Sequence, residues 1–349
     1  MNIKAIFMLA LMTAFSTGVN AQGFAGLGTT ADGFKQVVRG KEIEFPLDYG
    51  AHPGFRIEWW YVTANLVSDE GAAIGLQWTL FRQASSPKPD DGNWSTSEFW
   101  MGHSAVTSAN NHFYAEKLAR GGSGQAGART DTIDVWVDDW AFTETSPDRL
   151  ALKAAGDRFS YTLKLHPTGD EVRHGENGYS VKSAQGQASY YFSHPFLEVS
   201  GSVTIDDKVH TVTGNAWLDR EWSSQPLADN QEGWDWFSIK FDDGNRLMAF
   251  SLRDTNGDRY VSGSWISEDG SISPLAGDKI DLAPRAQSSV AGRSIPTSWR
   301  ISIPSRKVEL NIDALNPQSW MSTSIPYWEG PVTVSGSHKA MGYLEMTGY

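Results

Sequence analysis

The sequence predicts an all-β protein made of antiparallel strands. From Ile57 onward, apolar and polar residues alternate with a period of two, and no window of helical length carries an apolar stripe with a period of 3.6. One such strand places four apolar side chains on a single face, namely Ile74, Leu76, Trp78 and Leu80. Short acidic turns that contain glycine, such as residues 69–71, separate the strands. These patterns predict a meander that closes, or nearly closes, into a barrel.

A weak internal repeat favours two similar β domains. Residues 59–82 contain an aromatic strand, an acidic turn with glycine and an amphipathic strand that ends in Arg82, and residues 234–253 repeat this order and end in Arg253. Coincidence between two ordinary hairpins is the alternative, because hairpins share this chemistry. We predict an N-terminal domain at residues 22–222 and a C-terminal domain at residues 223–349. Within the second, residues 271–297 hold three prolines and predict a long excursion.

Residues 1–21 predict a secretory signal peptide. Lys4 precedes an apolar run from Ala5 to Phe15, and residues 19–21 form a small-x-small site for cleavage after Ala21. A membrane anchor is the weaker alternative, because a spanning helix needs about 20 apolar residues and polar residues interrupt this run. We therefore expect a periplasmic or secreted protein with no integral membrane segment after cleavage.

The composition excludes several kinds of site. The chain has no Cys, which excludes disulfides, a thiolate nucleophile and Cys-ligated metals. Its eight His residues form no His-x-His or His-x-x-x-His pair, and no Gly-rich phosphate loop is present, so we expect neither a metal nor a cofactor. The net charge of −12 argues against nucleic acid as a partner. The oligomeric state stays open.

The first candidate site lies at residues 56–61. Alternation puts Arg56, Glu58 and Trp60 on one face of the strand and Tyr61 on the other. Arg56 and Glu58 are close enough in sequence to pair on that face. Their pairing has two interpretations, which are a structural ion pair at a barrel mouth and a pocket acid held by its neighbour.

The second candidate site lies at residues 217–222. Here Trp217, Asp219 and Glu221 share one face, while Trp222 lies on the other. Two carboxylates about 7 Å apart on one face can share a proton or divide into acid and base, with one pKa raised. Surface strands also carry such pairs, but they seldom place Trp on both sides.

Other candidates are single residues. Asp235 lies between Trp234 and Trp236 but faces away from both, so a hydrogen-bonded core carboxylate and a catalytic group are equally good interpretations. Glu329 follows an aromatic pair in a segment that predicts a rigid, partly buried turn.

Two further residues are weaker candidates. Glu345 also interrupts an apolar strand, and we place it below Glu329. His103 is more simply interpreted as a buried histidine with satisfied hydrogen bonds than as a base.

Five motifs, in this order, resemble those of the AttH/carotenoid 1,2-hydratase (hydroxyneurosporene synthase) family. They are Ile57-Glu58-Trp59-Trp60-Tyr61, Gly102-His103-Ser104, Ala216-Trp217-Leu218-Asp219-Arg220-Glu221-Trp222, Gly233-Trp234-Asp235-Trp236 and residues 342–349. The resemblance implies two tandem lipocalin-like (calycin) antiparallel β-barrel domains. It also implies a hydrophobic, isoprenoid-like or lipid-like small molecule at or near their interface.

Members of that family differ in function. Some hydrate a carotenoid double bond, some fungal relatives guide cycloadditions, and many exported bacterial members have no assigned activity. The hydratase branch uses a His near a Trp in its central motif, and this chain has no histidine between His210 and His338. An acid catalyst here would therefore have to be Asp219, Glu221 or Glu58.

Three functions follow as expectations. The first is a carrier of an apolar ligand, the second is a hydratase or cyclase that uses carboxylate acid/base chemistry, and the third is a carbohydrate-processing enzyme. The expected catalytic residues are Asp219, Glu221 and Glu58. The expected ligand-binding residues are Arg56, Trp60, Tyr61, Trp217, Trp222, Asp235, Trp236 and Glu329.

Overall fold

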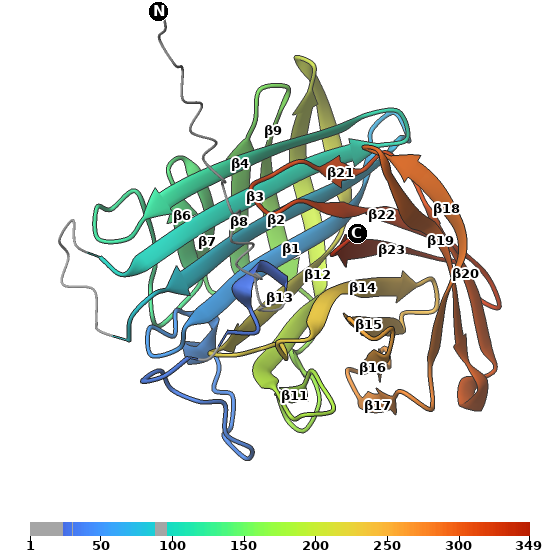
Figure 1. Cartoon of the computed structure of the whole chain (residues 1–349). Coiled ribbons are helices and arrows are strands. Elements are labelled where there is room, and N and C mark those ends of the chain that lie inside the picture. Colours follow the sequence, from blue (N-terminus) through green and yellow to red (C-terminus); the bar gives the residue numbers. More distant parts are fainter. Residues whose placement is uncertain (1–23, 30, 88–95) are drawn as a thin grey trace, which may run out of the picture.

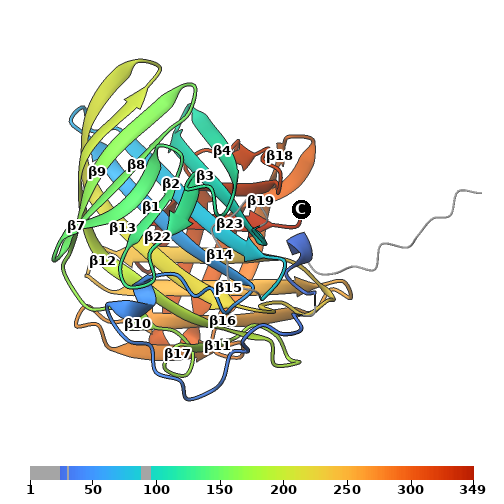
Figure 2. The same ribbon diagram turned by 90° about the vertical axis from the view of Figure 1, so that its left-hand side faces the viewer.

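The protein is an all-β molecule with two lipocalin-like barrels side by side, as the sequence predicts (Figures 1 and 2). The structure is a computed structural model and describes residues 24–29, 31–87 and 96–349. The predicted signal peptide at residues 1–21 lies outside the described residues. Among the described residues, no helix has the length and apolar character needed to cross a membrane.

The first sheet forms a nearly closed barrel in the order β4-β3-β2-β1-β13-β12-β9-β8-β7-β6-β5. Its strands are β1 (Ile57–Ser68), β2 (Ala73–Ala84), β3 (Glu98–Ser108), β4 (His112–Arg120), β5 (Ala126–Ala128), β6 (Asp134–Val137), β7 (Trp140–Ser146), β8 (Arg149–Ala155), β9 (Phe159–Pro167), β12 (Ala188–Ile205) and β13 (Lys208–Ser223), while the short β10 (Val172–Arg173) and β11 (Tyr179–Val181) pair with β12. Two 3-10 turns, η1 (Phe24–Gly26) and η2 (Leu47–Tyr49), precede β1. Between β4 and the β6–β7 turn, Lys117 forms ion pairs with Asp139 and with Asp138 at 3.4 Å.

The second sheet is a half-barrel in the order β17-β16-β15-β14-β23-β22-β20-β19-β18. Its strands are β14 (Gln231–Phe241), β15 (Arg246–Asp254), β16 (Arg259–Ile266), β17 (Ile272–Ala276), β18 (Asp281–Val290), β19 (Arg293–Ile303), β20 (Val308–Ala314), β22 (Tyr327–Gly336) and β23 (Ala340–Thr347), with the 3-10 turn η3 (Pro304–Arg306) after β19 and the short β21 (Trp320–Met321) paired to β22. β14 lies between β15 and β23, just as β1 lies between β2 and β13. The two repeated hairpins therefore occupy the same place in their sheets.

The expected excursion at residues 271–297 is wrong, because this segment forms β17, β18 and the start of β19. Pro274 and Pro284 lie on the two edge strands, β17 and β18, where a missing N–H can face away from the ladder. Pro296 lies opposite a register shift between β18 and β19. The prolines therefore mark edges and irregular pairing in this sheet, and they do not mark a loop.

The chain passes from the first sheet to the second between Ser223 and Gln231. The division into domains at residues 22–222 and 223–349 stays a prediction.

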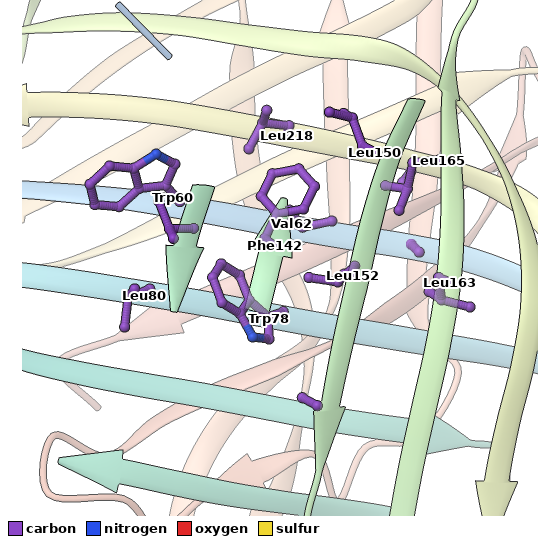
Figure 3. Close-up of a cluster of buried hydrophobic side chains, with 14 of the residues drawn as sticks. Trp60, Val62, Trp78, Leu80, Phe142, Leu150, Leu152, Leu163, Leu165 and Leu218 are labelled. Atoms are coloured by element: carbon purple, nitrogen blue, oxygen red, sulfur yellow. The ribbon is translucent and has the colours of Figure 1, made fainter. Parts of the chain in front are cut away.

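Large side chains fill the interior of each barrel. In the first barrel, Trp60, Trp78, Phe142 and the leucines around them point from facing strands into one core (Figure 3). In the second, Phe237, Trp299 and Trp328 belong to a separate core. A third cluster, which includes Tyr61, Tyr191, Trp217, Trp236 and Phe250, lies between the two barrels. Space for a ligand is therefore to be sought between the barrels.

The two barrels approach closely at one glycine. A Cβ atom on Gly75 of β2 would lie 2.4 Å from Cγ of Pro331 on β22. Hydrogen bonds also cross the interface, for example from Tyr61 Oη to Glu329 Oε1 at 2.8 Å and from Trp236 Nε1 to Tyr191 Oη at 3.1 Å. The interface is thus built by packing and by buried polar contacts.

Candidate functional site

A cavity of about 150 Å³ lies between the two barrels, and we call it the interface cavity. It is roughly ten times larger than the space that one water molecule needs. One wall comes from β1, β2, β3, β12 and β13, and the other from β14, β15, β22 and β23. Most lining residues are apolar or aromatic, including Trp59, Tyr61, Phe81, Met101, Tyr191, Leu227, Trp234, Trp236 and Phe250. Its ionisable lining residues include Asp219, Glu221, Glu345, Lys182 and His103.

Asp219 is held on β13 by three donors. Its Oδ1 atom accepts hydrogen bonds from Trp217 Nε1 at 2.6 Å and from the Ser193 hydroxyl, and its Oδ2 atom accepts one from Tyr191 Oη at 2.8 Å. Burial outweighs these hydrogen bonds and raises the pKa of Asp219 to about 7. The group is therefore divided between its acid and carboxylate forms near neutral pH.

Glu221 lies two residues along β13 on the same face. Lys182 Nζ is 3.1 Å from its Oε1 atom, and the Ser189 hydroxyl donates to it. The ammonium group of Lys182 also lies 4.4 Å from the ring centroid of Tyr191. The expected pair of carboxylates on one strand face is present, and each member has its own partners.

Glu345 of β23 is a second cavity-lining carboxyl group with a raised pKa. It lies directly opposite Glu329 in the register of β22 and β23, so the two carboxyl groups are neighbours on one face of the sheet. Trp234 Nε1 also donates to Glu345 Oε1. Burial raises the pKa of Glu345 to about 7 and, together with the charge of Glu345, raises that of Glu329 well above its usual value. The pair therefore retains a proton at neutral pH.

The residues on the opposite face of β1 and β13 point into the first barrel. Glu58 accepts hydrogen bonds from Arg82 Nε at 2.5 Å and Arg220 Nη2 at 3.0 Å. Burial alone would raise its pKa, but the two guanidinium groups and His52 lower it well below its usual value. Trp60 lies under Arg220, whose guanidinium carbon is 3.9 Å from the ring centroid. Glu58 and Trp60 therefore do not line the interface cavity.

Three other expected site residues also lie away from the cavity. Trp222 stacks on His52 inside the first barrel, with ring centroids 3.9 Å apart. Asp235 faces the interior of the second barrel, where it pairs with Arg253 at 2.6 Å and accepts a hydrogen bond from Tyr349 Oη at 2.7 Å.

Arg56 is the third of these residues. It precedes β1 and donates to the carbonyl of Ser224 at 2.7 Å. The expected pairing of Arg56 with Glu58 is wrong, because Glu58 pairs with Arg82 of β2 and Arg220 of β13, the two strands next to β1.

The structure therefore brings together part of the expected site. Tyr61, Asp219, Glu221 and Trp236 line the cavity. Trp217 and Glu329 lie behind the lining: Trp217 donates a hydrogen bond to Asp219, and Glu329 accepts one from Tyr61 and lies opposite Glu345. Among the polar lining residues, sequence reasoning missed Lys182, Tyr191 and Tyr327, and it placed Glu345 and His103 among the weaker candidates. The period of two on β23 was the one signal for Glu345, since it places Glu345 on the face that carries Tyr343 and Thr347. Among the described residues, no group of three His, Cys, Asp or Glu side chains is placed to hold a metal ion.

Comparisons with known proteins agree with the fold. A model of the AttH-like family matches residues 36–349. The chain belongs to the AttH-like family. A crystal structure of an AttH protein from Nitrosomonas europaea has 34% sequence identity and a TM-score of 0.82, and the match covers 90% of this chain and 99% of that one.

A more distant neighbour shares the fold of this AttH-like protein. Kievitone hydratase from Nectria haematococca has 13% identity and a TM-score of 0.67, and the match covers 92% of this chain and 98% of that one. Comparison with curated proteins gave no match.

Proposed function

We propose that this AttH-like protein binds an apolar, isoprenoid-like or lipid-like small molecule in the interface cavity and adds water to one of its carbon–carbon double bonds. One observation carries the proposal: two carboxyl groups, Asp219 and Glu345, line a largely apolar cavity and each has a pKa of about 7. A carboxyl group that is still partly protonated at neutral pH is suited to act as a general acid.

The walls of the cavity suit the charge that such a reaction develops. Proton transfer to an alkene leaves a carbocation, and aromatic faces stabilise a cation by about 0.5–2 kcal/mol per ring. Tyr61 and Trp236 meet edge to face at the cavity, with ring centroids 5.2 Å apart. Apolar lining from both barrels would exclude bulk water, which strengthens each electrostatic contact.

Hydration is favoured as the reaction class by membership of the AttH-like family and by the name of one structural neighbour. The structural neighbour from Nectria haematococca is called a hydratase, and at 13% identity its likeness concerns the fold alone. Hydration by this chain is therefore a proposal, and its main support is the pair of carboxyl groups, Asp219 and Glu345, in the cavity.

A carrier is the second candidate, and the hydrogen bonds of Asp219 favour it. Both oxygens of Asp219 already accept hydrogen bonds from the protein, an arrangement that also suits a fixed wall of a binding site. A carrier would bind the same class of ligand and release it unchanged. Carbohydrate processing is less favoured, because the lining is largely apolar.

The experiment combines binding and turnover. Ligands that remain bound after purification are extracted and identified by mass spectrometry, and farnesol serves as a supplied probe with trisubstituted double bonds. We expect farnesol to quench Trp fluorescence and to gain the mass of one water.

Two single variants and their double variant test the carboxyl groups. Asp219→Asn and Glu345→Gln should bind farnesol but hydrate it more slowly, while the exposed Asp313→Asn serves as the matched control. Turnover that survives in the Asp219→Asn, Glu345→Gln double variant would exclude the carboxylate mechanism, and binding with no turnover by the native protein would favour the carrier.

Export is part of the same proposal and has a separate test. We propose that the chain is exported to the periplasm or beyond, supported by the charge and apolar pattern of residues 1–21. Sequencing of the mature N-terminus should begin at Gln22. An N-terminus that still carries residues 1–21 would contradict export by cleavage.

A further inference from the structure

We propose that Tyr327, His103 and Glu116 form a relay that removes the proton from the water molecule as it adds to the ligand and passes that proton to solvent. This inference rests on the proposed hydration. In this proposal the general base is a chain of hydrogen-bonded side chains that crosses the barrel interface. Without it, a cavity carboxylate would have to act as the base.

The relay is continuous in geometry. Tyr327 Oη on β22 lies 2.9 Å from His103 Nδ1 on β3, and His103 Nε2 lies 3.0 Å from Glu116 Oε1 on β4. His103 and Glu116 are directly opposite each other in the register of β3 and β4. The rings of Tyr327 and His103 also stack with their centroids 5.5 Å apart. One barrel supplies the hydroxyl group and the other supplies the imidazole and the carboxylate.

The hydrogen bonds can run in only one direction. Glu116 also accepts from the backbone N–H and the hydroxyl of Ser324, each at 2.9 Å, which identifies Glu116 as a carboxylate that only accepts. His103 must therefore donate through Nε2 and accept at Nδ1, so Tyr327 donates its hydroxyl proton to His103. This is the arrangement of carboxylate, imidazole and hydroxyl by which a hydroxyl group is activated.

The protonation states agree with a relay that is ready to accept a proton. Burial lowers the pKa of His103 against the opposing effect of Glu116, so the imidazole is neutral at neutral pH. The hydrogen bond from His103 lowers the pKa of Glu116, which keeps it ionised. Burial and the nearby charge of Glu329 raise the pKa of Tyr327 well above its usual value, so the phenol keeps its proton until His103 takes it.

The relay joins the cavity to solvent. Tyr327 and His103 both line the interface cavity, while the side chain of Glu116 is 21% exposed. On the cavity wall, Tyr327 pairs with Thr347, so Glu345 is its diagonal neighbour on the same face, at a Cα separation of about 7–8 Å. The geometry thus pairs Glu345 as acid with Tyr327 as the group that meets the water.

The step balances in atoms and charge. Glu345 gives its proton to one alkene carbon, and the π bond breaks to leave a carbocation on the other. Water forms a carbon–oxygen bond there and loses a proton to Tyr327 Oη, whose own proton moves to His103 Nδ1. The imidazolium is paired with ionised Glu116, through which its Nε2 proton passes to solvent. Exchange of the remaining imidazole proton from Nδ1 to Nε2 through solvent then restores the resting state for the next turnover. Glu345 regains a proton from solvent, and no other reactant is needed.

The test uses Tyr327→Phe and Glu116→Gln in the full chain, with Tyr343→Phe as the matched control. Tyr343 is buried on the same face of the second sheet but does not line the cavity. With farnesol as the probe, we expect Tyr327→Phe to lower kcat by about 100-fold or more with little change in KM, because a general base contributes about 10²–10⁴-fold. Tyr343→Phe should keep the native kcat.

Glu116→Gln has a different signature. It should shift the acid limb of the pH–rate profile to lower pH, because Glu116 raises the pKa of His103 and its loss removes that effect. A merely structural role for Glu116 would lower the rate without moving the limb. A limb that stays in place would overturn the relay.

The outcomes separate the relay from the hydration itself. If Tyr327→Phe turns over farnesol as fast as the native protein while Glu345→Gln is inactive, the relay is overturned and the proposed function stands. No turnover by the native protein would overturn the proposed function. In the unliganded protein, ¹⁵N NMR should show His103 neutral and protonated at Nε2, and protonation at Nδ1 would overturn the relay whatever the activity.

Discussion

Replacing Asp219 by asparagine should make the protein's stability less dependent on pH. In the unfolded chain an aspartate ionises at its ordinary pKa of 3.8, whereas burial moves the pKa of Asp219 to about 7 in the folded protein. Between these two values the folded protein keeps a proton that the unfolded chain has already released. The folded state therefore loses stability as pH rises through this window, and the loss is complete above about pH 7.

The size of the effect follows from the two pKa values. Each tenfold difference in proton affinity corresponds to about 1.4 kcal/mol, so ionised Asp219 costs the folded protein about 4 kcal/mol. Integrated between about pH 4.5 and pH 8, its ionisation removes about 3 kcal/mol from the free energy of unfolding. The amide side chain in Asp219→Asn cannot ionise, so this loss disappears in the variant. The variant also loses hydrogen bonds from Ser193, Tyr191 or Trp217, which shifts its stability at every pH but leaves the slope unaffected.

The assay is urea unfolding followed by Trp fluorescence at several pH values. The difference in free energy of unfolding between Asp219→Asn and the native protein should move by about 3 kcal/mol in favour of the variant from about pH 4.5 to pH 8. Glu70→Gln is the control, because Lys208 lowers the pKa of this exposed carboxylate and the difference should be small and opposite in sign. Parallel stability curves for Asp219→Asn and the native protein would refute the raised pKa of Asp219.

Two further predictions concern the framework of the site. Arg82→Met should lower the free energy of unfolding by about 3–5 kcal/mol, because it leaves the fully buried Glu58 without one of its two arginine partners, and an unchanged urea midpoint would contradict this. Gly75→Ala should lower the free energy of unfolding by about 1–3 kcal/mol, because the new methyl group would clash with Pro331 across the barrel interface. A higher free energy of unfolding in this variant would contradict the close packing at Gly75.

The sequence predicts the faces of the strands well. Strand pleating alone determines that Glu58 and Trp60 point one way and Tyr61 the other, and that Asp219 and Glu221 share a face. It does not determine which face meets a barrel core and which meets the cavity, because both faces of β1 and β13 carry aromatic rings and charges. Glu58 and Asp219 are thus equal candidates in the sequence, and only the packing of the two barrels separates them.

Partners across strands lie beyond the reach of the sequence. Glu58 is held by Arg82 and Arg220, which are 24 and 162 residues away in the chain, whereas spacing along the sequence favours the nearby Arg56 as its partner. Glu345 gains its raised pKa from burial and lies opposite Glu329 in the register of β22 and β23. Both pairings depend on register, which the alternation of single strands does not determine.

The central claim is that a carboxyl group in the interface cavity protonates a double bond to which water then adds. The most direct test incubates the protein with farnesol in H₂¹⁸O and analyses the product by mass spectrometry. The account predicts a hydrated product that carries one ¹⁸O atom with the native protein, and its loss in Glu345→Gln. A product without ¹⁸O, or equal ¹⁸O incorporation by Glu345→Gln and the native protein, would contradict the account.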